Sequence, residues 1–481
     1  MNAHGYEPVI GVEVHVQLRT RTKLFCRDVA EFGAEPNTNV CPVCLGLPGA
    51  LPVINGAAID LAIAAALGLG CTVHTTSVFA RKNYFYPDLP KGYQITQFDR
   101  PLATDGGLEA ENGDQGPGFV RIRRIHLEED AGKSLHDRFA DRTAIDLNRA
   151  GVPLIEIVTE PDLRSPAHAR AFLNLLKRTL EYLDVSDCDM EKGSLRVDAN
   201  VSIRQTGETR LGTKTEIKNM NSFANIERAI GFEVERQVAI VSAGSAVVHE
   251  TLLWDAGRNT ARPMRSKEES HDYRYFPEPD LPPLVLGESR IDAERAALPE
   301  LPHVREARFR EDWELPAYDS GVLTASRALA DYYEDVARGA GDAKLAANWV
   351  MTDVLGWLNQ RGLSIEDAPV DAERLAALVR LAAGGIVSST GARAVFARMA
   401  EGDARTPEDI VQAEGLAQVR DDAAIAAWVD DVIAQHADEF TRLCQGEDRL
   451  LPFLMGQVMK RSKGKADPRR ATELIKQRAA G

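Results

Sequence analysis

Strand patterns fill the first part of this chain and then stop, and this break limits the possible folds more than any other feature. Residues 9–18 alternate between apolar and polar side chains, as expected for a half-buried strand. A similar alternation covers residues 196–204. Beyond a stiff, proline-rich segment at residues 276–283 the patterns become helical and alanine-rich, which indicates a domain boundary.

The sequence therefore predicts three domains, in line with a length of 481 residues. Residues 1–295 are expected to form an α+β domain with a mixed, largely antiparallel sheet. Residues 296–407 are expected to form an all-α domain, and residues 408–481 a small α-helical tail domain. The order of helices and strands is too irregular for a Rossmann sheet, and no G-x-G-x-x-G motif follows a strand.

The composition narrows the classes of function. With a formal net charge of −15, the chain cannot attract nucleic acid through its average field, so any such contact needs a local basic patch. Six cysteines in a chain of this length do not form a disulfide scaffold, and they favour a reducing cytoplasm. The N-terminus has no signal-peptide pattern, and the longest apolar run, residues 57–69, is too short to cross a bilayer. No membrane association is therefore expected.

The most acidic motif lies at residues 123–134, where three consecutive carboxylates follow a basic and apolar run. Crowded carboxylates repel one another, and burying them without partners is costly. The neighbouring arginine, histidine and lysine therefore indicate a site for a cation or a phosphate–metal complex, with a solvated acidic turn as the alternative. The Gly-Lys-Ser that follows is not part of a P-loop, because Leu127 stands where the first glycine of that motif is required.

Two other segments carry residues that suit a divalent metal. Glu13 and His15 share the polar face of the first strand, about 7 Å apart. Such a pair is more often an ordinary surface face, unless a second segment such as residues 126–130 supplies further ligands. Glu156 lies between two isoleucines in a short apolar run, so it is expected to be buried and to need a metal or an arginine as its partner.

A group of thiols near the N-terminus is a candidate zinc site. Cys41 and Cys44 have the C-x-x-C spacing of a zinc knuckle, and Cys26 offers a third thiolate. A structural zinc site needs a fourth ligand, for which Asp28 is the candidate. Two interpretations stay open: zinc bound with a weaker fourth ligand, or a degenerate site with inert thiols.

Cationic side chains mark two further candidate sites. Lys82, Asn83 and Lys91 belong to an aromatic and proline-rich stretch, and they suit an anionic or amide-bearing substrate unless the stretch is only an aromatic-packed turn. The C-terminus is strongly basic, which in an acidic chain favours contact with RNA or phosphate over a solubilising tail. The basic residues expected to bind there are Lys460, Arg461, Lys463, Lys465, Arg469 and Arg470.

Several long motifs resemble those of one family, the B subunits of tRNA-dependent amidotransferases (GatB). The motifs are unrelated to one another, and the resemblance extends over almost the whole chain. They are GVEVHVQL at 11–18, RKNYFYPD at 81–88, HLEEDAGKS at 126–134, PLIEIVTEPD at 153–162, DYRYFPEPD at 272–280 and LMGQVMK at 454–460.

The resemblance implies both a fold and an activity. The family fold is an α+β cradle, then a helical domain, then a small helical tail that contacts tRNA. The B subunit works in a heterotrimer with A and C subunits, which converts glutamate on tRNA(Gln), or aspartate on tRNA(Asn), to the amide. It is the ATP-dependent kinase that phosphorylates the side-chain carboxylate before ammonia from the A subunit displaces phosphate. A catalytically inactive tRNA-binding adaptor and a metal-dependent hydrolase acting alone are the alternatives.

The resemblance also implies roles for the residues singled out above. Five side chains would be catalytic, and all but Glu129 would bind Mg²⁺ (or Mn²⁺): Glu13, His15, Glu128, Glu129 and Glu156. Lys82, Asn83 and Lys91 would line the path of the substrate and ammonia. Many relatives have four zinc cysteines, whereas Asp28 stands at the second position here, so zinc binding by this chain stays open.

Overall fold

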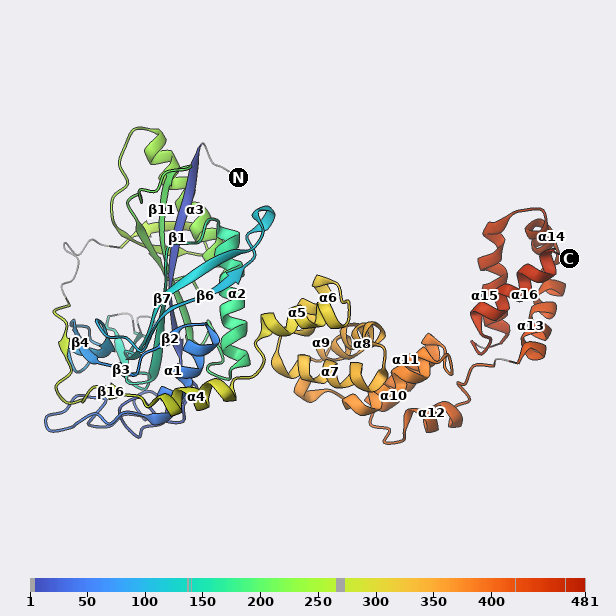
Figure 1. Ribbon diagram of the computed structural model, residues 1–481, viewed down its shortest axis with the longest axis horizontal. Helices are drawn as coiled ribbons and strands as arrows, with labels where there is room; N and C mark the ends of the chain where they lie inside the picture. Colours follow the sequence, from blue (N-terminus) through green and yellow to red (C-terminus); the bar gives the residue numbers. More distant parts are fainter. Residues whose placement is uncertain are drawn as a thin grey trace. The chain divides into compact units, whose positions relative to one another are not determined.

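The computed structural model describes residues 5–135, 138–139, 141–264, 273–419, 421–462 and 464–480. Contacts between residues divide the chain into two units, Met1–His303 and Val304–Gly481, and each is described here by itself (Figure 1). Within the described ranges, no helix has the length and apolar character needed to cross a membrane.

The first unit combines a large sheet with four helices. Its helices are α1 (Gly56–Gly68), α2 (Pro166–Tyr182), α3 (Phe223–Ser242) and α4 (Glu288–Ala297). Its strands are β1 (Tyr6–Gln17), β2 (Thr72–Val73), β3 (Thr76–Ser77), β4 (Phe79–Asn83), β5 (Tyr93–Gln97), β6 (Ala103–Ala110), β7 (Gly118–Glu129), β8 (Lys133–Leu135), β9 (Ala144–Asp146), β10 (Pro153–Thr159), β11 (Leu195–Gln205), β12 (Thr215–Lys218), β13 (Thr251–Asp255), β14 (Thr260–Pro263), β15 (Phe276–Pro277) and β16 (Leu284–Val285).

The large sheet is mixed and mostly antiparallel, as predicted. Nine strands follow the order β14-β13-β12-β11-β1-β10-β7-β6-β2. Only the pair of β12 and β13 is parallel among the pairings that the structure describes in this sheet. The first strand, β1, therefore lies in the middle of the sheet, between β11 and β10, which come much later in the sequence.

Alternation along β1 separates the core from the site. Ile10, Val12, Val14 and Val16 are buried in one hydrophobic core with residues of α2 and α3, while the residues between them project from the other face of the sheet. Helices α2 and α3 pack against each other (Figure 1). Ser165 caps the N-terminus of α2, because its side chain accepts a hydrogen bond from the backbone N–H of His168.

A three-stranded sheet, in the order β15-β4-β5, contacts the end of β7. The hydroxyl of Thr96 donates to a Glu128 oxygen at 3.1 Å, and the backbone N–H of Ile95 donates to a Glu129 oxygen at 2.9 Å. The side-chain amide of Gln94 donates to the Glu129 carbonyl at 2.7 Å. These bonds hold the small sheet against the two consecutive carboxylates of β7.

The second unit is helical, and the structure describes no named strand after β16. Its helices are α5 (Pro302–Asp312), α6 (Ala317–Leu323), α7 (Arg327–Ala340), α8 (Ala343–Trp349), α9 (Leu355–Asn359), α10 (Ala372–Ala383), α11 (Ser389–Ala400), α12 (Pro407–Ala413), α13 (Asp422–Gln435), α14 (Ala437–Cys444), α15 (Leu451–Arg461) and α16 (Pro468–Ala480). Two separate hydrophobic cores form, one within residues 309–411 and one within residues 425–475. The order of an α+β region followed by helices is confirmed, and the exact domain boundaries near residues 295 and 407 stay predictions.

Candidate active site

A row of acidic and histidine side chains crosses three neighbouring strands of the large sheet. His15 of β1 pairs with Glu156 of β10, and Glu156 pairs in turn with His126 of β7. Glu128 lies two residues further along β7 and projects from the same face. The register of the sheet thus brings together side chains from distant parts of the sequence.

Glu156 lies between two imidazole rings. Its Oε2 atom is 3.3 Å from His15 Nε2 and 3.4 Å from His126 Nε2. Glu128 also reaches both rings: its Oε1 atom is 3.7 Å from His15 Nε2, and its Oε2 atom is 3.7 Å from His126 Nε2. One ligand atom each from His15, Glu128 and Glu156 lies within 4.8 Å of the others, a spacing that suits a single divalent cation. Three of the predicted magnesium ligands therefore meet.

Burial and pairing set the charges in this cluster. Glu128 is 2% exposed and Glu156 is 6% exposed. Burial alone would raise the pKa of each carboxyl, but the histidines outweigh it, and both pKa values are lowered. Burial likewise works to lower the pKa of His126, whereas Glu156 and Glu128 raise it to about 9. Without a metal, the cluster therefore consists of ionised carboxylates around a protonated His126 at neutral pH.

His126 is absent from the set of site residues predicted from the sequence, although its segment was proposed as a source of ligands. Its side chain is buried, and its Nδ1 atom has no hydrogen-bond partner among the described residues. The available signal was its position two residues before Glu128, which puts both side chains on one face of a strand.

Glu13 lies on the same face of β1 but outside the group of ligand atoms that converge within 4.8 Å. Its carboxylate accepts a hydrogen bond from Asn200 Nδ2 at 3.0 Å. Burial raises the pKa of Glu13, and the charges of Glu156 and Glu216 raise it further. Glu13 therefore links the cluster to polar side chains of β11 and β12.

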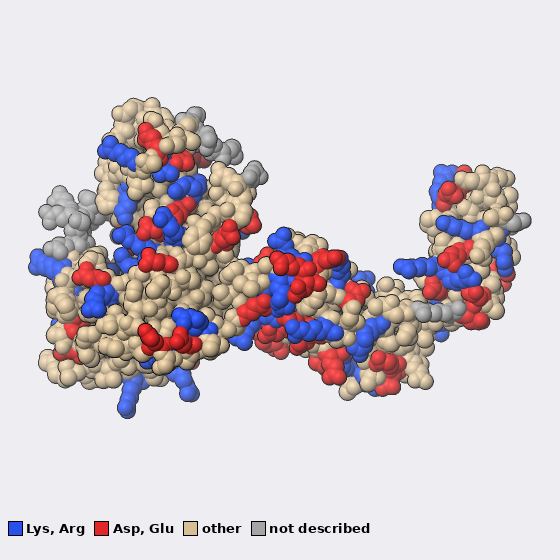
Figure 2. Space-filling model, in the orientation of Figure 1, with Lys and Arg blue, Asp and Glu red and all other residues tan. Residues whose placement is uncertain are grey.

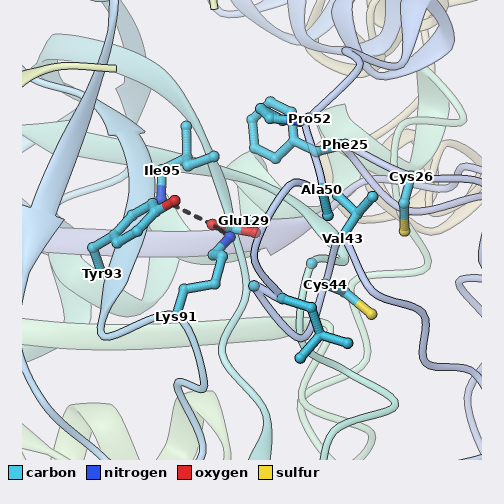
Figure 3. A pocket seen from close by; sticks show the side chains of 13 residues that line it. Phe25, Cys26, Val43, Cys44, Ala50, Pro52, Lys91, Tyr93, Ile95 and Glu129 are labelled. Atoms are coloured by element: carbon cyan, nitrogen blue, oxygen red, sulfur yellow. Dashed lines mark hydrogen bonds and ion pairs between the residues drawn. The ribbon is translucent and has the colours of Figure 1, made fainter. Parts of the chain in front are cut away.

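Glu129 follows Glu128 directly and therefore projects from the opposite face of β7. Its carboxylate forms an ion pair with Lys91, and both side chains are almost fully buried. A cavity of about 130 Å³ lies here, and its lining includes Tyr93, Cys26 and Cys44 (Figure 3). The structure thus separates Glu129 from the metal-binding candidates, and its predicted catalytic role stays a prediction.

Lys82 and Asn83 alternate along β4 and have different surroundings. Burial works to lower the pKa of Lys82, but the charges of Glu128 and Glu156 raise it above its usual value. Lys82 is therefore a charged ammonium that faces the carboxylate–histidine cluster. Asn83 instead donates its side-chain amide to the backbone carbonyls of Tyr273 and Arg274, at 3.1 and 2.9 Å. These contacts hold the segment just before β15 against β4.

Asp130, the third carboxylate of the acidic motif, is held by cations. Its Oδ1 atom accepts a hydrogen bond from Arg196 at 2.9 Å, and its Oδ2 atom accepts one from Gln17 at 2.8 Å. Arg149 approaches the same carboxylate at 3.7 Å. Burial would raise the pKa of Asp130, but Arg196 and Arg149 outweigh it and lower the pKa. This residue therefore pins β11 and β1 to the end of β7.

The predicted zinc ligands do converge. Ligand atoms of Cys26, Asp28, Cys41 and Cys44 lie within 4.8 Å of one another. The Asp28 carboxylate is 3.2 Å from the Cys44 sulfur and 3.5 Å from the Cys26 sulfur. A hydrogen bond from Cys26 lowers the pKa of Cys44 to about 6, although burial opposes this shift. The ammonium of Lys23 lies 3.7 Å from the Cys44 sulfur and favours its thiolate.

The predicted tRNA-binding residues of the tail divide into two groups. Arg461 forms an ion pair with Asp431, and Arg470 with Asp422. By contrast, no carboxylate partner exists among the described residues for the side chains of the remaining three, which are Lys460, Lys465 and Arg469. Lys463 lies outside the described residues. Figure 2 shows basic and acidic side chains intermixed on the visible face of the tail helices.

Comparisons with known proteins identify the family. A model described as the GatB/GatE catalytic domain matches residues 8–292. The chain belongs to the GatB family. A second model, described as the GatB domain, matches residues 331–478, so the family assignment covers both units. The resemblance of the sequence motifs to GatB is thereby confirmed.

Curated GatB relatives match over nearly their whole length. The proteins from Prosthecochloris aestuarii and Chlorobium phaeobacteroides are each 50% identical to this chain, over 474 and 480 residues. The first match covers 98% of both chains, and the second covers 99% of this chain and 100% of the relative. A third, from Nitrosococcus oceani, is 50% identical over 475 residues, or 98% of this chain and 99% of its own. All three are named as the B subunit of aspartyl/glutamyl-tRNA(Asn/Gln) amidotransferase.

Replacing Glu156 with Gln in metal-free protein should lower the pKa of His126. Glutamine keeps the size of the side chain but removes the largest of the charges that raise this pKa. The opposing effect of burial, which lowers the pKa, is then less compensated. The expected fall is about one pH unit or more. It is measured by a pH titration of the His126 resonance in histidine-labelled protein. The control is Glu160→Gln, whose partly exposed carboxylate pairs with Arg123. An unchanged His126 pKa in Glu156→Gln would contradict the described geometry.

Proposed function

We propose that this GatB-family chain is the B subunit of a glutamine-dependent tRNA amidotransferase, with Glu-tRNA(Gln) and/or Asp-tRNA(Asn) as substrate. It activates the side-chain carboxylate of the mischarged aminoacyl group with ATP and then forms the amide. The names of the full-length relatives support this assignment. The observation that carries it is the convergence of His15, Glu128 and Glu156 on one sheet face, with the Lys82 ammonium beside them.

The proposed reaction has two steps. The γ-phosphoryl group of ATP moves to an oxygen of the substrate carboxylate, which gives ADP and an acyl phosphate. Ammonia then attacks the carbonyl carbon, the C–O bond to phosphate breaks, and the nitrogen loses a proton to give the amide. Phosphate is a far better leaving group than the oxygen of a carboxylate, which is why activation precedes amide formation.

The donor set fits Mg²⁺ or Mn²⁺. Two ionised carboxylates supply hard oxygen ligands and His15 supplies a borderline nitrogen. His15, Glu128 and Glu156 would hold a divalent ion, which would supply positive charge that offsets the charge of the phosphates. Lys82 would bind phosphate as well, because the same carboxylates keep its ammonium group charged. An inactive adaptor is less consistent with this chain, because such an adaptor has no use for an intact buried cluster.

Ammonia in this proposal comes from a glutaminase A subunit, in a heterotrimer that also includes a C subunit and works in the cytoplasm. We place part of its path at the cavity lined by Lys91 and Glu129 (Figure 3). The polar lining suits a small polar molecule. Since Glu128 and Glu129 are consecutive, the cavity and the carboxylate–histidine cluster lie on opposite faces of one strand.

Glu13→Gln or Glu128→Gln should abolish ATP-dependent amide formation in the assembled complex. Each change removes a negative charge from the metal-binding face while keeping the size of the side chain. Glutamine hydrolysis should survive at least in part, because its nucleophile belongs to another subunit. The measurements are amide formed on tRNA, ATP cleaved and glutamine hydrolysed by the same preparations. Glu160→Gln is the matched control, and normal amidation by both site variants would refute the metal-site assignment.

The thiol–carboxylate cluster is proposed to bind structural zinc. Three thiols and the Asp28 carboxylate make up the four ligands that a structural site requires. Zinc would hold the loop between Cys26 and Cys44, which also lines the cavity. The ligand set is weaker than four thiolates, because a carboxylate replaces a thiolate that zinc prefers.

Purified wild-type protein should contain about one zinc ion per chain, and Cys41→Ser should lose it. Asp28→Cys should hold zinc against a chelator that removes it from the wild type. Elemental analysis and thermal unfolding with and without chelator measure both effects. The exposed Cys444→Ser is the control and should keep its zinc. Wild-type protein without zinc would show that the site is degenerate.

The tail is proposed to bind tRNA through the cations whose side chains have no carboxylate partner among the described residues. Truncation before Lys460 is not a suitable test, because it would also delete α16, which supplies Ala471, Leu474 and Ile475 to the tail core. An arginine that is already paired with a carboxylate must give up that ion pair to bind phosphate, so its contribution to the free energy of binding is smaller. Lys460 and Lys465 have no such partner among the described residues.

A triple variant, Lys460→Gln, Lys465→Gln and Arg469→Gln, should raise the KM for charged tRNA and flatten its dependence on salt. In a plot of log affinity against log salt concentration, each lost phosphate contact reduces the slope by roughly 0.7–0.9. The expected reduction in slope for the triple variant is therefore about one to three. The matched control replaces three cations that have carboxylate partners: Arg461→Gln, Arg470→Gln and Arg478→Gln. KM for charged tRNA is measured at three salt concentrations. Equal effects of the two triple variants would refute the distinction between tail cations with and without a carboxylate partner.

A further inference from the structure

A continuous series of aromatic rings borders the carboxylate–histidine cluster. Tyr84 and Tyr273 are in edge contact with centroids 6.0 Å apart, and Tyr273 meets Tyr275 in the same way at 5.9 Å. The series ends in a different geometry. Phe98 and Tyr275 lie face to face, with centroids 4.0 Å apart and an angle of 3° between their planes.

The backbone register explains why these rings face the cluster. In the pair of β4 and β5, Lys82 lies opposite Gln94, and Thr96 lies two residues beyond Gln94 on the same face. Thr96 donates its hydroxyl to Glu128, and the Lys82 ammonium lies 5.0 Å from the centre of the Tyr273 ring. Phe98 continues this alternation just beyond β5. The rings therefore form a wall beside the cluster.

The stacked pair is not part of the hydrophobic core of this unit. Phe98 is 43% exposed, and Tyr275 is partly exposed. The buried pair of Phe25 and Phe79 is different, because its rings meet edge-on at 82° inside the core. Two parallel, partly exposed rings at the edge of a charged site present a flat apolar face next to groups that suit phosphate.

We propose that the Phe98–Tyr275 pair binds an adenine base by stacking. This inference rests on the proposed function, which brings two adenines to the site: that of ATP, and that of the 3′-terminal adenosine carrying the aminoacyl group. Both molecules combine a flat base with anionic phosphate, and the chain offers aromatic faces and a Lys82 ammonium side by side. A base stacked on an aromatic ring is held without hydrogen-bond readout.

The test compares Phe98→Leu and Tyr275→Leu with two controls. Leucine keeps an apolar side chain but cannot stack, whereas Tyr275→Phe keeps the ring. Phe119→Leu removes a ring that is 60% exposed near the start of β7, at the far end of that strand from Glu128. KM is measured in the assembled complex, for ATP at saturating charged tRNA and for charged tRNA at saturating ATP.

Both leucine variants should raise the same KM, roughly 5- to 150-fold, because stacking is worth about 1–3 kcal/mol per base. A raised KM for ATP assigns the pair to the nucleotide, and a raised KM for tRNA assigns it to the terminal adenosine. Tyr275→Phe and Phe119→Leu should stay within about twofold of wild type. If both leucine variants keep both KM values, the pair does not bind adenine.

Equilibrium binding separates this inference from the proposed function. ATP and a short RNA ending in CCA are titrated into the wild-type complex and into each variant, so no turnover is required. A complex without amidation activity in which the leucine variants still weaken one of these ligands would refute the proposed function and keep the adenine site. Equal binding of both ligands by wild type and leucine variants would refute the adenine site alone. Thermal unfolding of each variant confirms that the folded complex is being compared.

Discussion

Two carboxylates buried side by side are the constraint on which the site depends. Glu128 and Glu156 repel each other and have lost almost all contact with water, so each needs cationic partners to stay ionised. His15, His126 and Lys82 provide them, and they come from three different strands. The same negative charge that destabilises the metal-free arrangement would attract a divalent ion in the proposed reaction. Stability and the proposed reactivity would then have one electrostatic origin.

Two central strands, at residues 9–18 and 196–204, and the side chains that share a face of the first were predictable from alternation alone. Glu13 and His15 were correctly assigned to one face, and Glu156 was correctly expected to be buried. Its partners were not predictable, because an arginine or a metal fits the same argument, and only the pairing of β10 with β1 and β7 selects two histidines. Strand order is a property of long-range pairing, which local periodicity does not contain.

Other differences between the sequence-based expectations and the structure have local reasons. The three acidic residues at 128–130 look like one group in the sequence, yet strand alternation and the strand end send them to three environments: the histidines, Lys91 and Arg196. In the tail, counting charges identified a basic region, whereas the structure shows that some of these cations already have acidic partners on α13. The cysteine spacing was more informative, because C-x-x-C limits two ligands to one turn and leaves little freedom for the others.

The division of β7 into two faces has a consequence for how this protein can change in evolution. Point substitutions at Glu128 or Glu129 alter one face at a time, but a change in the length of the strand moves both acids. A residue inserted between Leu127 and Glu128 would itself occupy the place beside the histidines, while Glu128 would move to the place opposite Lys91. Deleting Leu127 would bring Glu129 beside the histidines, but Glu128 would then occupy the place of Leu127 in the hydrophobic core. Neither length variant keeps both the carboxylate–histidine cluster and the core, so the length of this strand is constrained more tightly than either acid alone.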